Sequence, residues 1–262
     1  MPPGIAVRTL LHILTKPEHQ KDLDQHAVRE IIEWLQANPD TDENELFKIE
    51  WGYLPLLDHQ VGRAPRGLER RLARDPAFFC EIIRLVFRSD KEDRKESQPS
   101  EQEQKLARNA YHLLDGWRTA PGTTADGKFN GEAFSKWLGE VKRQSKESGH
   151  FRIALDAIGK MLPHAPPSPD GLWIDRSIAE ELNARDAAEM RSGFTCELFN
   201  MRGTHGFSAG KEEREIAGAF FKKAEALEEN GYARIATAVR DLGKQYERDA
   251  EREEKSDPFE DG

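Results

Sequence analysis

The chain is poor in cysteine, with two in 262 residues, and this excludes a framework of disulfide bonds. Cys80 and Cys196 both stand among apolar neighbours, so the sequence favours two buried thiols in a reducing compartment. Long apolar runs are lacking too, since none approaches the roughly 18 residues that span a bilayer. The apolar patch at 10–14 is too short for a signal peptide. These absences predict a cytoplasmic protein that has no membrane partner.

Motifs that mark common reaction centres are also missing. The eight histidines are scattered, and neither HExxH nor paired CxxC is present, so we expect no metal site. The phosphate-binding pattern GxxxxGK followed by Ser or Thr is absent, as are GxSxG and the kinase signatures. We therefore expect no cofactor, and the sequence favours a non-enzymatic protein over an enzyme.

Positive charge is in the minority. The chain has 39 Lys and Arg against 48 Asp and Glu, a net charge of −9. Because non-specific nucleic-acid binding depends on neutralising phosphates, such a chain is a poor candidate for it unless a local basic patch exists. The mean hydropathy of −0.77 is low, yet helices that each bury one stripe tolerate it. Five tryptophans argue against global disorder.

The apolar residues that are present recur with the spacing of α-helices. Asp75-Pro76 is a strong helix start, and the segment that follows is apolar around most of its circumference, so we expect a central helix there. The segment 46–57 predicts a helix that kinks or ends near Leu54, because Pro55 lies inside it. Its Trp51 and Tyr53 are interpreted either as core residues or as a surface on which a ligand stacks, and core is favoured.

Similar patterns fill the rest of the chain. Ser100 and Glu103 form a capping box, and Asn230-Gly231 predicts the turn between two final helices. The fold class expected is all-α, with stacked helical hairpins in an α-solenoid-like or irregular bundle. Further helices are predicted at 4–15, from residue 22 or 24 to 38, 101–116, 131–149, 150–162 and 175–193, the last ending at Gly193 before an ordered loop at 194–210.

Composition shifts predict the domain organisation. Four prolines within 163–171 forbid a helix, so we expect a linker there. It separates an N-terminal helical subdomain, residues 1–162 with a charged loop at 89–101, from a C-terminal subdomain. The latter covers 172–250, ends in an αα-hairpin and is followed by a frayed acidic tail at 251–262.

Arginines concentrate between the two most apolar segments. Arg66, Arg70 and Arg74 recur at helical spacing, with Arg63 and Arg71 beside them and Glu69 as the only acid. On a helix the first three would lie along one side, where guanidinium groups could hold phosphates or an acidic partner. The alternative is a solvated face whose arginines pair with carboxylates elsewhere. This stripe is the best pointer to function in the sequence.

A second polar cluster consists of Arg202, His205 and Lys211 among three glycines. A glycine-rich turn that enters a helix could bind an anion on its free amides, with His205 acting as acid or base. An ordinary loop is the favoured interpretation. Glu212 and Glu213 resemble a solvated first helical turn.

Four segments carry a resemblance to a known class of proteins. They are EWGYLPLL (50–57), LARDPAFFCEIIR (72–84), GWRTAPGT (116–123) and FNMRGTHGF (199–207). They resemble the C-terminal helical region of large, mostly uncharacterised bacterial multidomain proteins. The resemblance spans most of the chain and implies a HEAT-like helical piece attached to other modules, with no catalytic residue to transfer. A chain of 262 residues by itself departs from that pattern, which favours a fragment.

The leading hypothesis is a non-enzymatic helical scaffold or interaction domain that binds a protein partner or another domain of its parent protein. The alternative is an accessory module that binds nucleic acid or a nucleotide through the arginine stripe. A third hypothesis, an enzyme that uses Arg202 and His205, requires both side chains in one concave pocket.

Overall fold

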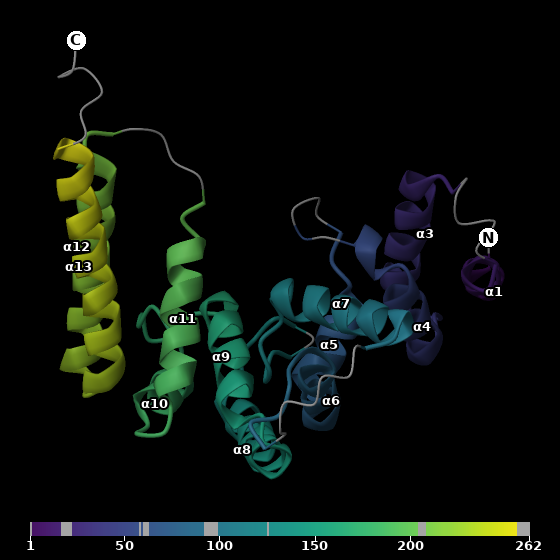
Figure 1. Cartoon of the computed structure of the whole chain (residues 1–262), viewed down its shortest axis with the longest axis horizontal. Coiled ribbons are helices and arrows are strands. Elements are labelled where there is room, and N and C mark those ends of the chain that lie inside the picture. The colour runs from purple at the N-terminus through teal and green to yellow at the C-terminus, as the bar shows by residue number, and fades with distance from the viewer. Residues whose placement is uncertain are drawn as a thin grey trace. The chain divides into compact units, whose positions relative to one another are not determined.

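A computed structural model describes residues 2–16, 23–57, 59, 63–91, 99–124, 126–203 and 208–255. Twelve α-helices make up most of these ranges, which contain no β-strand and only isolated bridges, such as that between Thr123 and Phe129 (Figure 1). The all-α prediction is therefore confirmed. The chain forms two compact units, Met1–Thr119 with Glu147–His150, and Ala120–Lys146 with Phe151–Gly262. The proline-rich segment 163–171 lies inside the second unit, and the subdomain boundary expected there remains a prediction.

The first unit begins with three helices around one core: α1 (Pro3–Leu14), α3 (Gln25–Ala37) and α4 (Glu43–Gly52). Asp24 starts α3, because its carboxylate accepts hydrogen bonds from two first-turn amides. Ile32, Leu35 and Ile49 are fully buried between these helices. Tyr53 joins the same core and donates a hydrogen bond from its hydroxyl to the carbonyl of Leu10 at 2.9 Å. The core interpretation of Tyr53 is thus confirmed.

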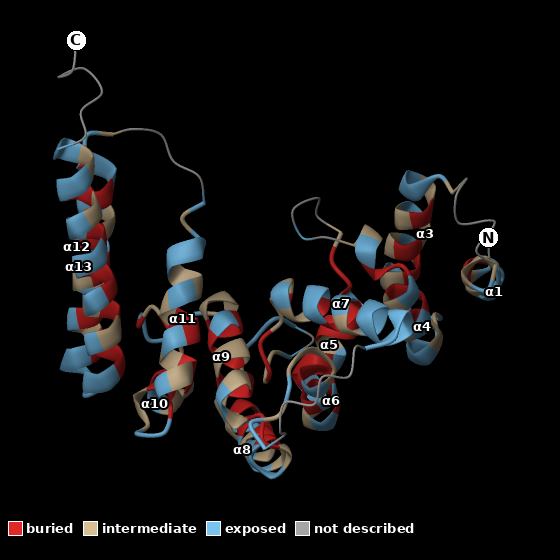
Figure 2. Ribbon diagram, viewed as in Figure 1, coloured by how far each residue is buried: buried red, intermediate tan, exposed pale blue. Residues whose placement is uncertain are grey.

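In the rest of this unit, the proline and the capping box seen in the sequence mark helix ends. Helix α4 ends at Gly52, and Pro55 lies in the short 3₁₀ turn η1 (Leu54–Leu56), as predicted. Three helices follow, namely α5 (Arg66–Arg74), α6 (Pro76–Val86) and α7 (Glu101–Asp115). Ser100 and Glu103 form the expected capping box at the start of α7. Buried residues follow the inner faces of these helices (Figure 2), while residues 92–98 of the predicted charged loop lie outside the described ranges.

The second unit contains most of α8 (Gly131–Ser148), then α9 (Phe151–Met161), α10 (Arg176–Asn183) and α11 (Ala188–Asn200). Helices α12 (Lys211–Glu229) and α13 (Ala233–Lys255) form the predicted hairpin and run side by side along their length (Figure 1). Gly231 occupies the turn between them with φ +83°, a conformation that glycine adopts without strain. Helix α13 includes residues 251–255, so the predicted frayed tail is helical over its first five residues.

The prediction of a single helix at 175–193 is wrong in two respects, the number of helices and the role of Gly193. It is two helices, because Arg191 donates hydrogen bonds to the carbonyls of Leu182 and Ala184 and so completes the end of α10. Gly193 does not end a helix but lies inside α11, which replaces the first part of the loop predicted from residue 194. A Cβ atom on Gly193 would lie 2.2 Å from the carbonyl oxygen of Asp156 in α9. Glycine is therefore present because two helix backbones touch.

This contact gives a first testable prediction. Gly193→Ala should lower the free energy of unfolding by about 1–3 kcal/mol, because backbone atoms of α9 must move to admit the methyl group. Gly218→Ala in α12 is the matched control, since nothing lies within 4 Å of a Cβ there. It should be neutral or stabilising by up to about 1 kcal/mol. Urea unfolding followed by circular dichroism measures both free energies of unfolding. A value for Gly193→Ala equal to that of wild type would contradict the close approach of the α9 and α11 backbones.

Two expectations about burial need correction. Cys80 is buried, but Cys196 lies on the exposed side of α11, so only one thiol is in the core. Glu213 is 2% exposed and is not part of a solvated helical turn. Its burial follows from an ion pair with Arg202, which the local sequence does not reveal. Among the helices of the described ranges, none combines the length and apolarity that crossing a membrane demands.

Candidate functional site

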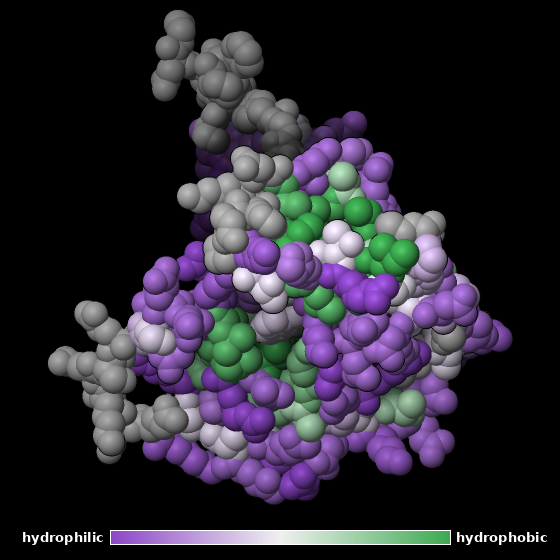
Figure 3. Space-filling view, turned by 90° about the vertical axis from the view of Figure 1, so that its right-hand side faces the viewer, coloured by the Kyte–Doolittle hydropathy of each residue, from purple (hydrophilic) through white to green (hydrophobic). Residues whose placement is uncertain are grey.

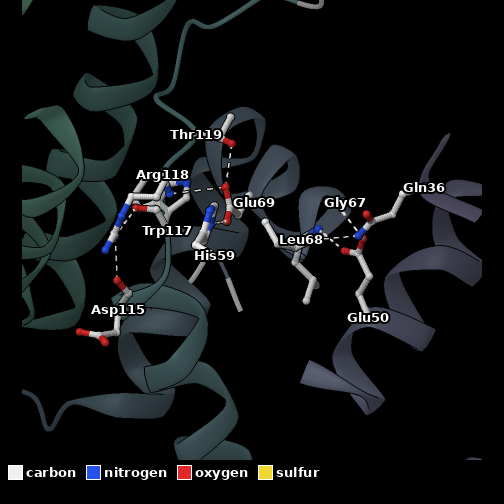
Figure 4. A network of polar contacts seen from close by, with 11 residues as sticks. Gln36, Glu50, His59, Gly67, Leu68, Glu69, Asp115, Trp117, Arg118 and Thr119 are labelled. Carbon is white, nitrogen blue, oxygen red and sulfur yellow. Dashed lines mark hydrogen bonds and ion pairs between the residues drawn. The ribbon is translucent and has the colours of Figure 1, made fainter. Parts of the chain in front are cut away.

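Helix α5, which carries the arginine stripe, is fixed at its start by a buried carboxylate from α4. Glu50 has no exposed surface. Its Oε1 accepts hydrogen bonds from Gln36 Nε2 at 2.7 Å and from the amide of Gly67 at 3.0 Å, and its Oε2 accepts one from the amide of Leu68 at 2.7 Å (Figure 4). Pro65, which precedes α5, supplies no side-chain cap. Glu50 therefore satisfies the first-turn amides from a distance of 17 and 18 residues in the sequence.

The protonation of Glu50 reflects two opposing effects. Burial removes water from the carboxylate and raises its pKa above 4.5, the ordinary value. The hydrogen bonds from Gly67, Leu68 and Gln36 and the positive charge of Arg70 oppose this rise without cancelling it. A Cβ atom at Gly67 would lie 2.8 Å from Glu50 Oε2, so a larger residue there would displace the carboxylate from its present position.

A second buried carboxylate holds α5 near its middle. Glu69 is 2% exposed, and one of its oxygens contacts His59 Nε2 in an ion pair or hydrogen bond (Figure 4). Its other oxygen accepts hydrogen bonds from Thr119 Oγ1 at 2.8 Å and from the amide of Arg118 at 3.4 Å. The segment that follows α7 is thus tied to α5, and the outer side of α5 is presented in one orientation.

The structure places the predicted arginines in different environments. Within the described ranges, the side chains of Arg66, Arg70 and Arg74 form no hydrogen bond or ion pair, and they follow one another along α5 at helical spacing. Arg63 instead lies with its Nε 3.7 Å from Glu33 Oε2. Arg71 places its guanidinium over two aromatic rings, as described below. The interpretation as solvated ion pairs therefore fits Arg63, and also Arg71, whose Nε lies 4.0 Å from Asp75 Oδ2, but not the three stripe arginines.

The stripe arginines line two neighbouring hollows rather than one flat strip. Arg70 and Arg74 share the first, here called the arginine hollow, with Arg71, and the remaining lining residues are Glu43, Asn44, Leu46 and Gly67. Arg66 and Arg70 contribute to the second, whose other lining residues are His59, Ala64, Glu69, Arg118 and Thr119. Arg70 thus belongs to both.

An apolar groove adjoins the arginine hollow at Arg71. The guanidinium carbon of Arg71 lies 4.5 Å from the ring centre of Phe47 and 5.0 Å from that of Phe78. The groove is lined by Arg71 and by Phe47, Trp51, Phe78, Glu81, Ile82, Leu85 and Leu106. Trp51 therefore faces the surface, unlike Tyr53. On the face drawn in Figure 3, hydrophobic patches lie between broad hydrophilic areas, so exposed apolar surface is localised.

The second predicted cluster is occupied by carboxylates of the chain itself. Arg202, 12% exposed in its side chain, pairs with the buried Glu213. The amide of Gly210, where α12 begins, donates to Glu253 Oε2 at 2.6 Å. Lys211 is exposed in the first turn of α12, and His205 lies outside the described residues. The ordinary structural interpretation is favoured for Arg202, and binding of an external anion or a catalytic role with His205 remains a prediction.

The sequence interpretation missed the residues that anchor α5. Glu50 is the only acid in the segment FKIEWGYL and lies directly between Ile49 and Trp51, and this was a usable signal of a buried, bonded acid. Glu69 was noted only as the single acid among arginines. His59 and Thr119 gave no signal, because their partner lies 10 and 50 residues away.

Comparison with known proteins gave no match: no family model, no curated protein and no solved structure is similar to the chain. The described residues also contain no group of three or more histidine, cysteine, aspartate or glutamate side chains that could hold a metal ion. The resemblance to the helical region of bacterial multidomain proteins stays a prediction.

Proposed function

We propose that the chain is a non-enzymatic helical scaffold that binds a protein partner, or another domain of a larger parent protein, through the arginine face of α5. One observation carries the proposal. Arg66, Arg70 and Arg74 form no side-chain hydrogen bond or ion pair with a described residue, although the chain has nine more acids than Lys and Arg. Arginine forks bind carboxylates in pairs, so three such groups on one helix are suited to an acidic surface.

The anchoring of α5 supports this proposal. Buried glutamates are costly unless their hydrogen bonds are complete, and Glu50 and Glu69 both meet that requirement. They fix a helix whose outer side is occupied by cations. A fixed surface loses less conformational entropy on binding than a mobile one. A HEAT-like position within a bacterial protein and a cytoplasmic location belong to the same proposal.

Charge reversal on α5 tests the proposed contact. The tagged chain and the variant Arg66→Glu/Arg70→Glu/Arg74→Glu would each capture proteins from a lysate of the source cells. We expect wild type to retain a stoichiometric partner and the variant to lose at least about 90% of it, because three favourable contacts become repulsive. A matched reversal of three exposed cations on α7, α12 and α13, Lys105→Glu/Lys222→Glu/Arg248→Glu, should retain the partner. Equal recovery by both variants would contradict the proposal.

Binding of nucleic acid or a nucleotide is the second candidate, and the second hollow favours it. His59, Arg66, Arg70 and Arg118 line that hollow together, and cations around a hollow suit a phosphate group. The net charge of −9 opposes it. A titration with labelled oligonucleotide and with ATP at low salt decides the matter, and a flat response removes this candidate.

A further inference from the structure

The arginine hollow and the apolar groove adjoin each other because Arg71 lines both. This side chain lies over Phe47 and Phe78, and its Nε is 4.0 Å from Asp75 Oδ2. The guanidinium is therefore held by two rings and a carboxylate while 43% of its side chain stays exposed. A cation fixed in this way can present its remaining N–H groups to a ligand with little loss of freedom.

The two halves have different chemistry. In the arginine hollow, three arginines stand against one acid, Glu43, which gives a formal charge of +2 within a chain of −9. In the groove, Arg71 and Glu81 cancel formally and the other lining residues are apolar. The rings of Phe47 and Trp51 are stacked, with centres 6.4 Å apart and planes inclined by 11°, and provide a flat apolar wall. One half thus suits carboxylates, and the other suits an apolar side chain.

We infer that this bipartite surface binds a short acidic segment of a partner protein, in which an aromatic or large aliphatic side chain lies beside two or more carboxylates. The apolar side chain enters the groove between Trp51, Phe78 and Leu106, and the carboxylates bind Arg70, Arg71 and Arg74. This inference rests on the proposed function and specifies the chemistry of the partner.

The same lining argues against a phosphate backbone as the ligand. Glu43 and Glu81 place one carboxylate in each half, so the surface as a whole carries three positive and two negative charges, a formal charge of +1. A polyanion would gain no net attraction in the groove, where Glu81 offsets Arg71, and it would leave most of the apolar wall uncovered. A peptide can place its charges where the arginines are and its apolar side chain where the rings are.

Selection from a peptide library tests the inference without knowledge of the natural partner. The full chain would be immobilised and offered a phage-displayed library of random dodecapeptides. We expect the retained peptides to be enriched in Asp and Glu around one Phe, Trp, Leu or Met. Retained peptides that are neutral or basic, or that lack the apolar residue, would overturn the inference.

Two exposed substitutions then locate the binding surface. Affinity of a fluorescein-labelled selected peptide would be measured by fluorescence polarisation. Arg74→Glu in the hollow and Leu106→Glu at the groove should each weaken binding about tenfold or more. Arg84→Glu on α6 is the control for Arg74→Glu, and Tyr111→Glu on α7 is the control for Leu106→Glu, because each repeats the change of charge of its counterpart at an exposed residue outside the two linings. They should alter affinity by less than about twofold.

The outcomes separate this inference from the proposed function. Equal loss in variants and controls, or tighter binding of a single-stranded oligonucleotide than of the selected peptide, would overturn the inference. If no peptide is selected while charge reversal on α5 still abolishes capture of a protein partner, the inference fails and the scaffold proposal stands. If neither peptide nor partner is retained, both fail. Thermal unfolding of each variant confirms that a lost affinity does not report a lost fold.

Discussion

Replacing Glu50 with alanine is expected to lower the free energy of unfolding of the N-terminal unit by about 3–5 kcal/mol. The carboxylate accepts hydrogen bonds from the amides of Gly67 and Leu68, and an alanine side chain offers these amides no acceptor. A buried donor left without a partner costs about 1–3 kcal/mol, and the cavity left by the side chain adds to this. Native-state hydrogen exchange on peptides that cover α4 and α5 measures the loss.

Two companion measurements identify the cause. Lys48→Ala, an exposed change on the same helix, should alter the free energy of unfolding by less than about 0.5 kcal/mol. The pH dependence supplies the second. Because burial raises the pKa of Glu50, the native state binds its proton more tightly than the unfolded state does. This contribution to stability is complete below about pH 4.5 and is lost as pH rises through the raised pKa, so Glu50→Ala should lack that decline. A decline that persists unchanged would assign it to another group.

Arg202→Ala is expected to destabilise the second unit by a similar amount, about 3–5 kcal/mol, because it leaves a buried glutamate without its cation. Glu213 is 2% exposed, and Arg202 is its ion-pair partner, while Ser208 Oγ donates to it at 2.8 Å. Burial by itself would raise the pKa of Glu213, but the hydrogen bonds from Arg202 and Ser208 outweigh burial and lower the pKa to about 2.

The sign of the pH effect is opposite to that of Glu50. A lowered pKa means that Glu213 contributes stability above about pH 4.5, and this is lost as pH falls towards 2. Thermal unfolding between pH 2 and 6 should show this acid sensitivity in wild type and not in Arg202→Ala. Arg214→Ala is the matched control, since its pair with Glu254 is exposed on both sides, and it should cause a much smaller change. Equal effects of the two substitutions would contradict a buried ion pair at Glu213.

Helix positions could be read from the sequence because their signals are local. Apolar spacing and the caps at Asp24, Asp75 and Ser100 lie within a few residues of the helices that they start, and the structure contains all three. Gly193 was misread for the same reason. As a local signal it indicates a helix end, but its actual role depends on Asp156 in another helix, 37 residues earlier.

In the candidate site, too, local features could be predicted from the sequence and contacts between distant residues could not. Helical spacing was enough to place Arg66, Arg70 and Arg74 along one side of a helix. It could not show that Arg63 pairs with Glu33 or that Arg71 lies over Phe47. Nor could it show that the buried carboxylates of Glu50 and Glu69 hold α5 in place through hydrogen bonds. Those relations join residues that are far apart in the chain, and only packing brings them together.

Site-specific photocrosslinking tests the central claim, that the arginine face of α5 and its adjoining groove contact a protein partner. Asn44 lines the arginine hollow and is exposed, so p-benzoylphenylalanine in its place samples that hollow while every arginine is kept. Lys222, exposed on α12, provides the matched position in the other unit. After irradiation in the source cells, we predict a covalent adduct of higher mass from position 44 and none from position 222. An adduct from position 222 alone, or from neither position, would contradict the account.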